Sequence, residues 1–120
     1  MSSLLASFWV ALGSALGGLS RYWLTIAGNR LMGAEFPWST IAINVAGSLI
    51  IGVVAARTPS EAARLFIMVG ICGGFTTFSA FSLQTLTLLQ EGAMLKALAN
   101  ALLSVFLCVA ATWAGWRLAT

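Results

Sequence analysis

Charge is scarce in this sequence, and histidine is absent. Only 8% of the 120 residues are charged, compared with roughly a quarter in a typical soluble domain, whereas 60% are hydrophobic. A chain of this composition has too few polar residues to cover a surface that faces water. Because the apolar residues are spread over the whole length, they cannot belong to a single anchor or to a removable signal peptide. The composition therefore predicts an integral membrane protein.

The same scarcities exclude several function classes. Without histidine, the only two cysteines, Cys72 and Cys108, cannot build a zinc or haem site, and their apolar surroundings favour buried structural thiols. The net charge of +3 comes from six basic and three acidic residues, too few for binding a nucleic acid. No nucleophile has a base beside it, so we do not expect an enzyme.

Acidic residues are missing from the apolar segments. Glu35, Glu61 and Glu91 all fall between them. A small proton-coupled multidrug exporter needs a carboxylate inside the membrane, so that exporter is the alternative function but is disfavoured. A helical assembly factor without a pore is another alternative, although it would not explain polar residues inside the spans.

Four windows are apolar enough to cross a bilayer, which takes about 20 residues each. They are 4–23, 38–56, 64–89 and 96–116. The connections between them are short and lie at 29–37, 57–61 and 90–95. We expect Gly28, Gly33 and Pro37 to break the helix around the first connection. The sequence therefore predicts an all-α membrane protein whose single domain has four transmembrane helices.

Basic residues are balanced between the two ends of these predicted helices. One side holds Arg57, Arg64 and Arg117, and the other holds Arg21, Arg30 and Lys96. Since the bias of lysine and arginine sets the orientation of a membrane protein, an equal split predicts insertion in both directions. Four helices can hardly enclose a lined pathway, so we expect an antiparallel, dual-topology homodimer of eight helices. The small residues Gly13 and Gly17 are spaced for close helix packing.

Three polar positions in the first two spans need partners inside the membrane. Arg21 could attract an anion at a vestibule or extend its charge to the lipid headgroups. Asn44 and Ser48 are four residues apart and share a face of the second helix. An amide at that depth can donate to an anion, or it can join two helices by hydrogen bonds.

Small polar side chains recur on the fourth span. They follow one another at intervals of four residues: Asn100, Ser104, Cys108 and Thr112. Residues at this spacing form one stripe along a helix. The stripe could line a narrow polar track, or it could be a packing seam between helices.

The third span has the most specific pattern. Gly73 and Gly74 precede two threonines in an otherwise apolar helix, and glycine costs about 1 kcal/mol relative to alanine there. We expect the helix to break at mid-membrane, which requires protein or a cavity to satisfy the freed backbone groups. The freed carbonyls would suit a hard cation such as sodium. Phe78 and Phe81 then face one side, where their positive ring edges could meet a small anion or simply pack in a core.

Three motifs carry a resemblance to a known family: GSALGGLSRY, STIAINVAGS and GICGGFTTFSAFS. In this order, on the first three spans, they resemble the fluoride ion channel family, the small dual-topology fluoride exporters of microbes. The resemblance covers essentially the whole chain. It implies a fluoride-selective channel in the inner cell membrane that exports fluoride passively, without a coupling ion or ATP, and so gives fluoride resistance.

The resemblance also implies roles for individual residues. The backbone carbonyls of Gly73 and Thr76 would hold a structural sodium ion at the centre of the homodimer, and Arg21 would lie at a vestibule. The fluoride path would be lined by Phe78, Phe81, Asn44, Ser79 and Ser104. Further polar-track candidates are Thr77, Asn100, Cys108 and Thr112.

Three positions depart from the family pattern. Ala80 stands where the family often has threonine, Gln84 where it often has glutamate, and Cys108 where a second track serine can occur. We therefore expect fewer hydrogen-bonding groups along the track, which would affect rate and selectivity more than identity.

Overall fold

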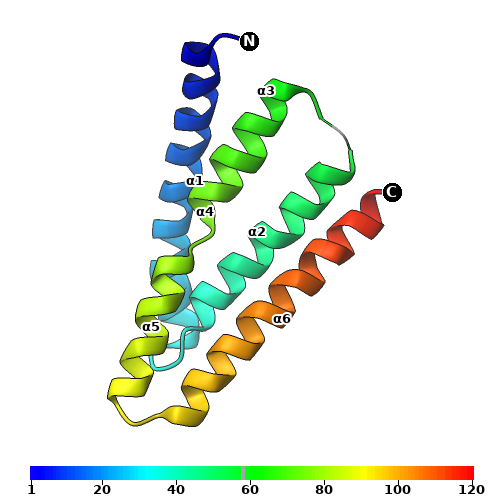
Figure 1. The fold of residues 1–120 in the computed structure, drawn as a ribbon. Helices are drawn as coiled ribbons and strands as arrows, with labels where there is room; N and C mark the ends of the chain where they lie inside the picture. The colour runs from blue at the N-terminus through cyan, green and yellow to red at the C-terminus, as the bar shows by residue number, and fades with distance from the viewer. Residues whose placement is uncertain (58) are drawn as a thin grey trace.

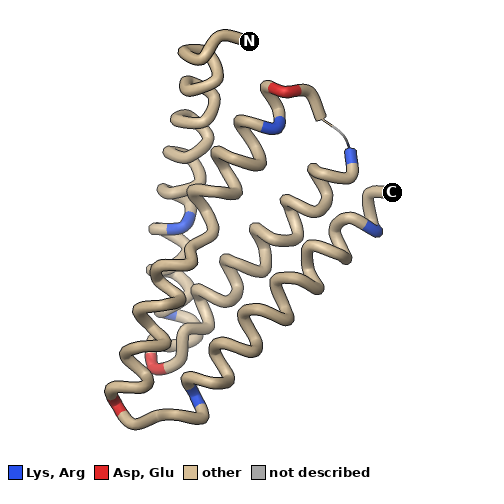
Figure 2. Tube along the Cα trace, in the orientation of Figure 1, with Lys and Arg blue, Asp and Glu red and all other residues tan. Residues whose placement is uncertain are grey.

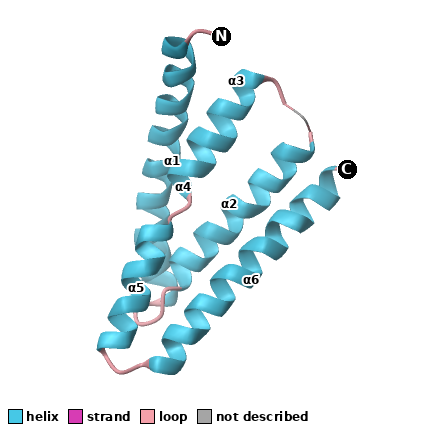
Figure 3. Ribbon diagram, in the orientation of Figure 1, coloured by secondary structure: helices cyan, strands magenta, loops and turns pink. Residues whose placement is uncertain are grey.

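A computed structural model describes residues 1–57 and 59–120 of the chain. Across these residues the chain consists of helices joined by turns and loops (Figure 3). Residue 58, which belongs to the predicted connection at 57–61, lies outside the described residues. The predicted all-α fold is confirmed.

Four helical segments are long and apolar enough to cross a membrane, as predicted. Three of them are continuous: α1 (Ser3–Met32), α2 (Trp38–Ala56) and α6 (Met94–Ala119). The third span is made of four pieces: α3 (Glu61–Ala63), η1 (Arg64–Cys72), α4 (Gly73–Phe75) and α5 (Phe78–Gln90). Both termini lie at the end of the bundle that holds the connection from α2 to α3 (Figure 1), as an even number of crossings requires.

The first helix is longer than the sequence predicts. It continues through Gly28 to Met32 and ends at Gly33, whose φ of 80° suits a glycine that terminates a helix. The prediction that Gly28 breaks the helix is wrong, and residues 29–32 are helical. Gly28 instead allows α1 to approach α2, because a methyl group there would lie 2.8 Å from Ser39 Oγ. Ser39 also donates a hydrogen bond of 2.6 Å to Asn29 Oδ1, so packing outweighs the local glycine signal.

Two helix contacts organise the bundle: α1 packs along η1 and α4, and α2 packs along α6. Gly13 and Gly17 are buried in the first contact. A Cβ on Gly13 would lie 2.9 Å from Gly70 Cα, and one on Gly17 would lie 2.8 Å from Phe75 N. The close packing predicted for this glycine pair is therefore confirmed.

The segment η1 is wound as a π-helix over nine residues, which no feature of the sequence indicated. Such winding is rare and often occurs next to functional sites. Here it leads through α4 into the interruption that precedes α5. Because α5 packs on α6 rather than on α1, the third span changes its packing partner where it is interrupted.

Candidate functional site

The third span breaks at Thr76 and Thr77, just after the glycine pair. Both threonines are extended, with ψ values of 156° and 122°, whereas Gly73 and Gly74 remain helical in α4. The predicted break is confirmed, but the threonines form it. Gly74 has a packing role instead, since a Cβ there would lie 2.6 Å from Ser14 O of α1.

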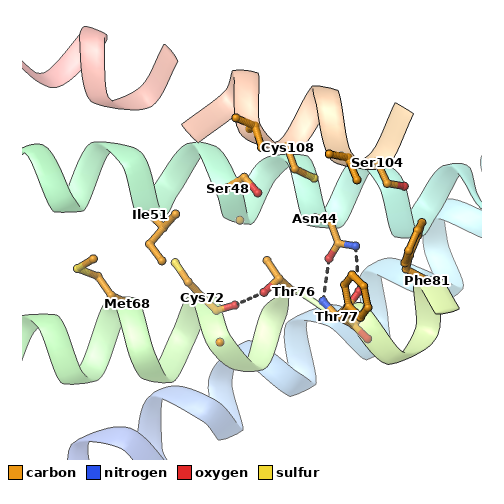
Figure 4. A pocket seen from close by; sticks show the side chains of 15 residues that line it. Asn44, Ser48, Ile51, Met68, Cys72, Thr76, Thr77, Phe81, Ser104 and Cys108 are labelled. Carbon is orange, nitrogen blue, oxygen red and sulfur yellow. Dashed lines mark hydrogen bonds between the residues drawn. The ribbon is translucent and has the colours of Figure 1, made fainter. Parts of the chain in front are cut away.

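Asn44 of α2 satisfies the backbone of the break. Its Oδ1 accepts a hydrogen bond from Thr77 N at 2.7 Å, and its Nδ2 donates one to Thr77 O at 3.0 Å (Figure 4). These two bonds join α2 to a segment whose backbone groups have left the helix. Because an amide nitrogen carries two hydrogens, one N–H of Asn44 remains for a ligand. Joining helices and binding an anion are therefore compatible roles for this residue.

Arg21 reaches the same break from α1. Its Nε donates a hydrogen bond of 3.2 Å to Gly74 O, and the side chain is half-buried. A cation near the last carbonyls of a helix complements the negative end of the helix dipole. The structure therefore joins Arg21 to the third span inside the bundle, while its role at a vestibule remains a prediction.

Hydrogen bonds from side chains occupy only some carbonyls of the break. Three carbonyls accept such bonds: those of Cys72, Gly74 and Thr77. Three others have no recorded donor in the described part of the chain: those of Gly73, Phe75 and Thr76. The two carbonyls expected to hold sodium are both in this free set, so the donor chemistry fits a hard monovalent cation.

A cavity of about 430 Å³ lies beside the break, between α2, the third span and α6 (Figure 4). It brings together most of the predicted site residues: Asn44, Gly73, Thr76, Thr77, Phe78, Phe81, Ser104 and Cys108. Ser48 lines it too, which confirms that it shares a face with Asn44. Ile51 and Met68 also line the cavity, and sequence reasoning missed them because apolar residues in apolar spans carry no distinguishing signal.

Phe78 and Phe81 contact each other at the wall of this cavity. Their ring centroids lie 5.2 Å apart, with the planes inclined at 49°. Phe78 is 77% exposed, so the pair does not form a closed core within one chain. The rings are therefore free to meet a ligand or another chain.

The polar stripe of α6 serves both purposes that the sequence left open. Ser104 and Cys108, its middle members, line the cavity. Asn100 is buried and donates a hydrogen bond of 2.9 Å to Thr85 Oγ1 of α5. Thr112 donates to Ser48 O at 3.1 Å. The outer members are thus a packing seam, and only the middle ones face open space.

Ser79 lies away from the cavity, although it was expected on the path. It is exposed, and its Oγ lies 3.4 Å from Thr77 Oγ1. Thr77 Oγ1 in turn accepts a hydrogen bond from Ala80 N and so caps the start of α5. These two hydroxyls therefore shape the end of the break in the single chain.

A second cavity, of about 570 Å³, lies where the α1–α2 and α5–α6 connections meet. Its polar lining residues are Asn29, Glu35, Gln84, Thr87, Glu91 and Lys96. Among the described residues, Gln84 Oε1 is buried without a hydrogen-bond partner. Gln84 follows Phe81 by one turn, so α5 connects the two cavities. Sequence reasoning missed this cavity because its lining comes from three separate segments.

Comparison with known proteins gives consistent matches along the chain. Residues 8–116 match the family model described as CrcB-like protein, Camphor Resistance (CrcB). A protein of Paramagnetospirillum magneticum is 54% identical over 119 residues, which is 92% of each chain. One of Rhodospirillum rubrum is 51% identical over 116 residues, covering 89% of this chain and 88% of the relative. One of Methylocella silvestris is 49% identical over 114 residues, covering 89% and 87%. Each of these relatives is named a fluoride-specific ion channel, FluC.

Proposed function

Because the chain belongs to the CrcB-like family and is similar to fluoride-specific ion channels over most of its length, we propose that it is a channel through which fluoride leaves the cell passively. The observation that best supports this proposal is the break in the third span, where an amide N–H, a pair of rings and a cavity meet. Irregular backbone at membrane depth is tolerated where it lines a cavity, and there it is typical of transport sites.

The cavity beside the break offers the donors that an anion would need. Fluoride is small and strongly hydrated, so a selective path must replace its water with donors. The free N–H of Asn44, the hydroxyl of Ser48, and the ring edges of Phe78 and Phe81 are available around this cavity. The hydroxyl of Ser104 lines the cavity too, and within the single chain it donates to Asn100 Oδ1 at 3.4 Å. The second cavity, with its polar lining, would be an aqueous mouth for the same path.

The membrane potential would supply the driving force. Protonated fluoride enters a cell from an acidic medium and dissociates in the more alkaline cytoplasm, which traps the ion. A negative-inside potential favours exit of an anion by about 2.3 kcal/mol per 100 mV. Export through an open path in the inner membrane would therefore need no coupling ion and no ATP.

A structural sodium ion is part of this proposal. The free carbonyls of Gly73 and Thr76 would hold it, two oxygens from each chain of a dimer. When bound, it would supply a fixed positive charge near the path. The two carbonyls suit this role because no protein donor is recorded for either of them in the described residues.

The proposed dimer explains groups that one chain leaves uncovered. Gly73 is exposed, and the nearest atom to a Cβ placed there is Met68 O, 4.0 Å away. Nothing in the described part of the single chain therefore requires glycine at this position, despite its cost of about 1 kcal/mol in a helix. A second copy against Gly73 would require it, and would also cover the exposed ring of Phe78.

Fluoride release from liposomes tests the channel function. The protein is reconstituted in vesicles loaded with potassium fluoride or potassium chloride, and a potassium ionophore is added to relieve the opposing potential. We expect rapid release of fluoride, recorded with an ion-selective electrode, and retention of chloride. Folded protein that releases neither ion would contradict the proposal, and proton-dependent efflux of a cationic drug would favour the multidrug exporter.

Labelling of a single introduced cysteine tests dual topology. Ser60 is exposed in the connection before α3, and Ser60→Cys changes no charge. We expect a membrane-impermeant thiol reagent to label part of the protein in sealed cells and the remainder after permeabilisation. The unsubstituted chain, whose own cysteines lie within the spans, measures the background. If the reagent labels all of the protein in sealed cells, or labels it only after permeabilisation, two orientations are ruled out.

A further inference from the structure

Arg21 has an unusual position for a charged residue, because it lies within α1 and bonds to the third span. Its Nε donates to the backbone carbonyl of Gly74 over a separation of 53 residues. Arginine at membrane depth is costly and generally interacts with other protein groups, including backbone carbonyls.

The break deprives the Gly74 carbonyl of its usual partner. In a continuous helix this oxygen would accept from the amide four residues on, which belongs to Phe78 at the start of α5. Thr76 and Thr77 are extended between them, so Arg21 supplies the donor instead. Without Arg21, the oxygen of Gly74 would be as free as those of Gly73 and Thr76, its neighbours along the break.

The two glycines of α4 also differ in their surroundings: Gly74 packs against α1, and Gly73 is exposed. A Cβ on Gly74 would meet Ser14 O at 2.6 Å, so Gly74 is packed against α1. Gly73 is exposed, away from α1. The hydrogen bond from Arg21 therefore holds the Gly74 carbonyl toward the scaffold helix, while the Gly73 carbonyl remains available.

We propose that Arg21 is a positioning residue that withdraws the Gly74 carbonyl from the cation site, leaving the carbonyls of Gly73 and Thr76 and thereby favouring sodium over potassium. This inference rests on the sodium site proposed above. The number of carbonyl dipoles around a monovalent ion contributes to its selectivity. An additional oxygen from each chain would make the site more suitable for the larger ion.

Two substitutions separate the hydrogen bond from other effects. In Arg21→Gln, the side-chain nitrogen Nε2 occupies the same place along the side chain as Nε of arginine, so a donor is kept. Arg21→Met puts a methyl group there and removes the donor. Arg30→Gln, an exposed residue near the end of α1, controls for loss of one positive charge.

The measurement is the thermal midpoint of the purified protein as sodium or potassium is titrated against a large organic cation. We expect the native chain, Arg30→Gln and Arg21→Gln to require less sodium than potassium for half of the stabilisation. In Arg21→Met the potassium concentration divided by the sodium concentration, each taken at half of the stabilisation, should fall by about tenfold. This is the size expected for loss of a hydrogen bond to a charged group. A general loss of stability would lower every midpoint without changing this ratio.

Several results would overturn the proposal. One is an unchanged ratio in Arg21→Met, and another is an equal loss of preference in Arg21→Gln, which would assign the effect to charge alone. A native chain with no preference between the ions would remove its basis. If Arg21→Met does not assemble, Arg21→Leu carries the same expectation. Fluoride release measured on the same preparations distinguishes these outcomes from failure of the channel function itself.

Discussion

The two halves of the third span differ in how one chain holds them. The half before the break, η1 and α4, packs against the glycine-lined face of α1, and Cys72 and Phe75 are only 3% and 9% exposed. The half after the break, α5, packs on α6, and Phe78 at its start is 77% exposed. The first half is thus packed into the scaffold, whereas the second presents the ring of Phe78 outward and that of Phe81 to the cavity.

This difference indicates that the two halves of one membrane span have different roles, one in packing and one at the site. The acidic residues lie near the ends of the helices (Figure 2), so the chemistry available at depth comes from backbone groups, amides, hydroxyls, rings and the guanidinium of Arg21. The break supplies the backbone groups, and Asn44 and Arg21 connect it to α2 and α1. Three kinds of change should therefore have separable effects on conduction. They are changes to the bonds that Asn44 makes with the break, to the half of the span that packs on α1, which we call the scaffold half, and to the cavity wall.

Asn44→Leu should have the largest effect, because it removes the hydrogen bonds that join the break to α2. It leaves both the N–H and the carbonyl of Thr77 without their partner, and each unsatisfied group costs about 1–3 kcal/mol. We expect fluoride release from liposomes to fall by about a hundredfold or more. Thr112→Val, which removes a hydrogen bond from α6 to the backbone of α2 at a residue that does not itself line the cavity, should conduct nearly normally. Normal conduction by Asn44→Leu would show that the break holds its form without this residue.

Gly17→Ala should damage the scaffold half. Its Cβ would lie 2.8 Å from Phe75 N, and overpacking of this kind costs about 1–3 kcal/mol. We expect a lower yield of assembled protein on size-exclusion chromatography, with normal release per assembled molecule. Gly18→Ala is the matched control, because no atom of residues 1–57 and 59–120 outside its own helix backbone lies within 4 Å of a Cβ there. Equal yields for the two variants would show that the close contact with α1 is dispensable.

Cys108→Ser should have the smallest effect, and it should increase conduction. A serine hydroxyl adds a stronger donor to the cavity wall at a half-buried position. One additional hydrogen bond of ordinary strength corresponds to an increase in fluoride release of about threefold. Cys108→Ala, which adds no donor, should show no increase. If serine and alanine behave alike, this position does not contact the ion.

The parts of the fold that depend on composition were predictable from the sequence. The four spans follow from the long apolar windows, and the interruption of the third follows from its glycines and threonines. The prediction failed at Gly28, where a local breaker signal was outweighed by contact with Ser39 on another helix.

The connections within the site could not be predicted in the same way. The bonds from Asn44 to Thr77 and from Arg21 to Gly74 join residues 33 and 53 positions apart. No local pattern encodes such pairs, because they depend on how the helices pack. For the same reason, the sequence indicated polar residues on α6 but not which of them face the cavity.

The central claim is that conduction belongs to the half of the third span after the break. Fluoride release by Phe81→Ile and Phe75→Leu, measured with the thermal midpoint of each protein, tests it most directly. We expect Phe81→Ile to assemble normally but to release fluoride about fivefold more slowly, since a ring edge in such contacts is worth about 1 kcal/mol. Phe75→Leu should lower the midpoint, because it truncates a buried ring, and should keep the native release rate. Full release by Phe81→Ile together with slow release by Phe75→Leu would contradict the account.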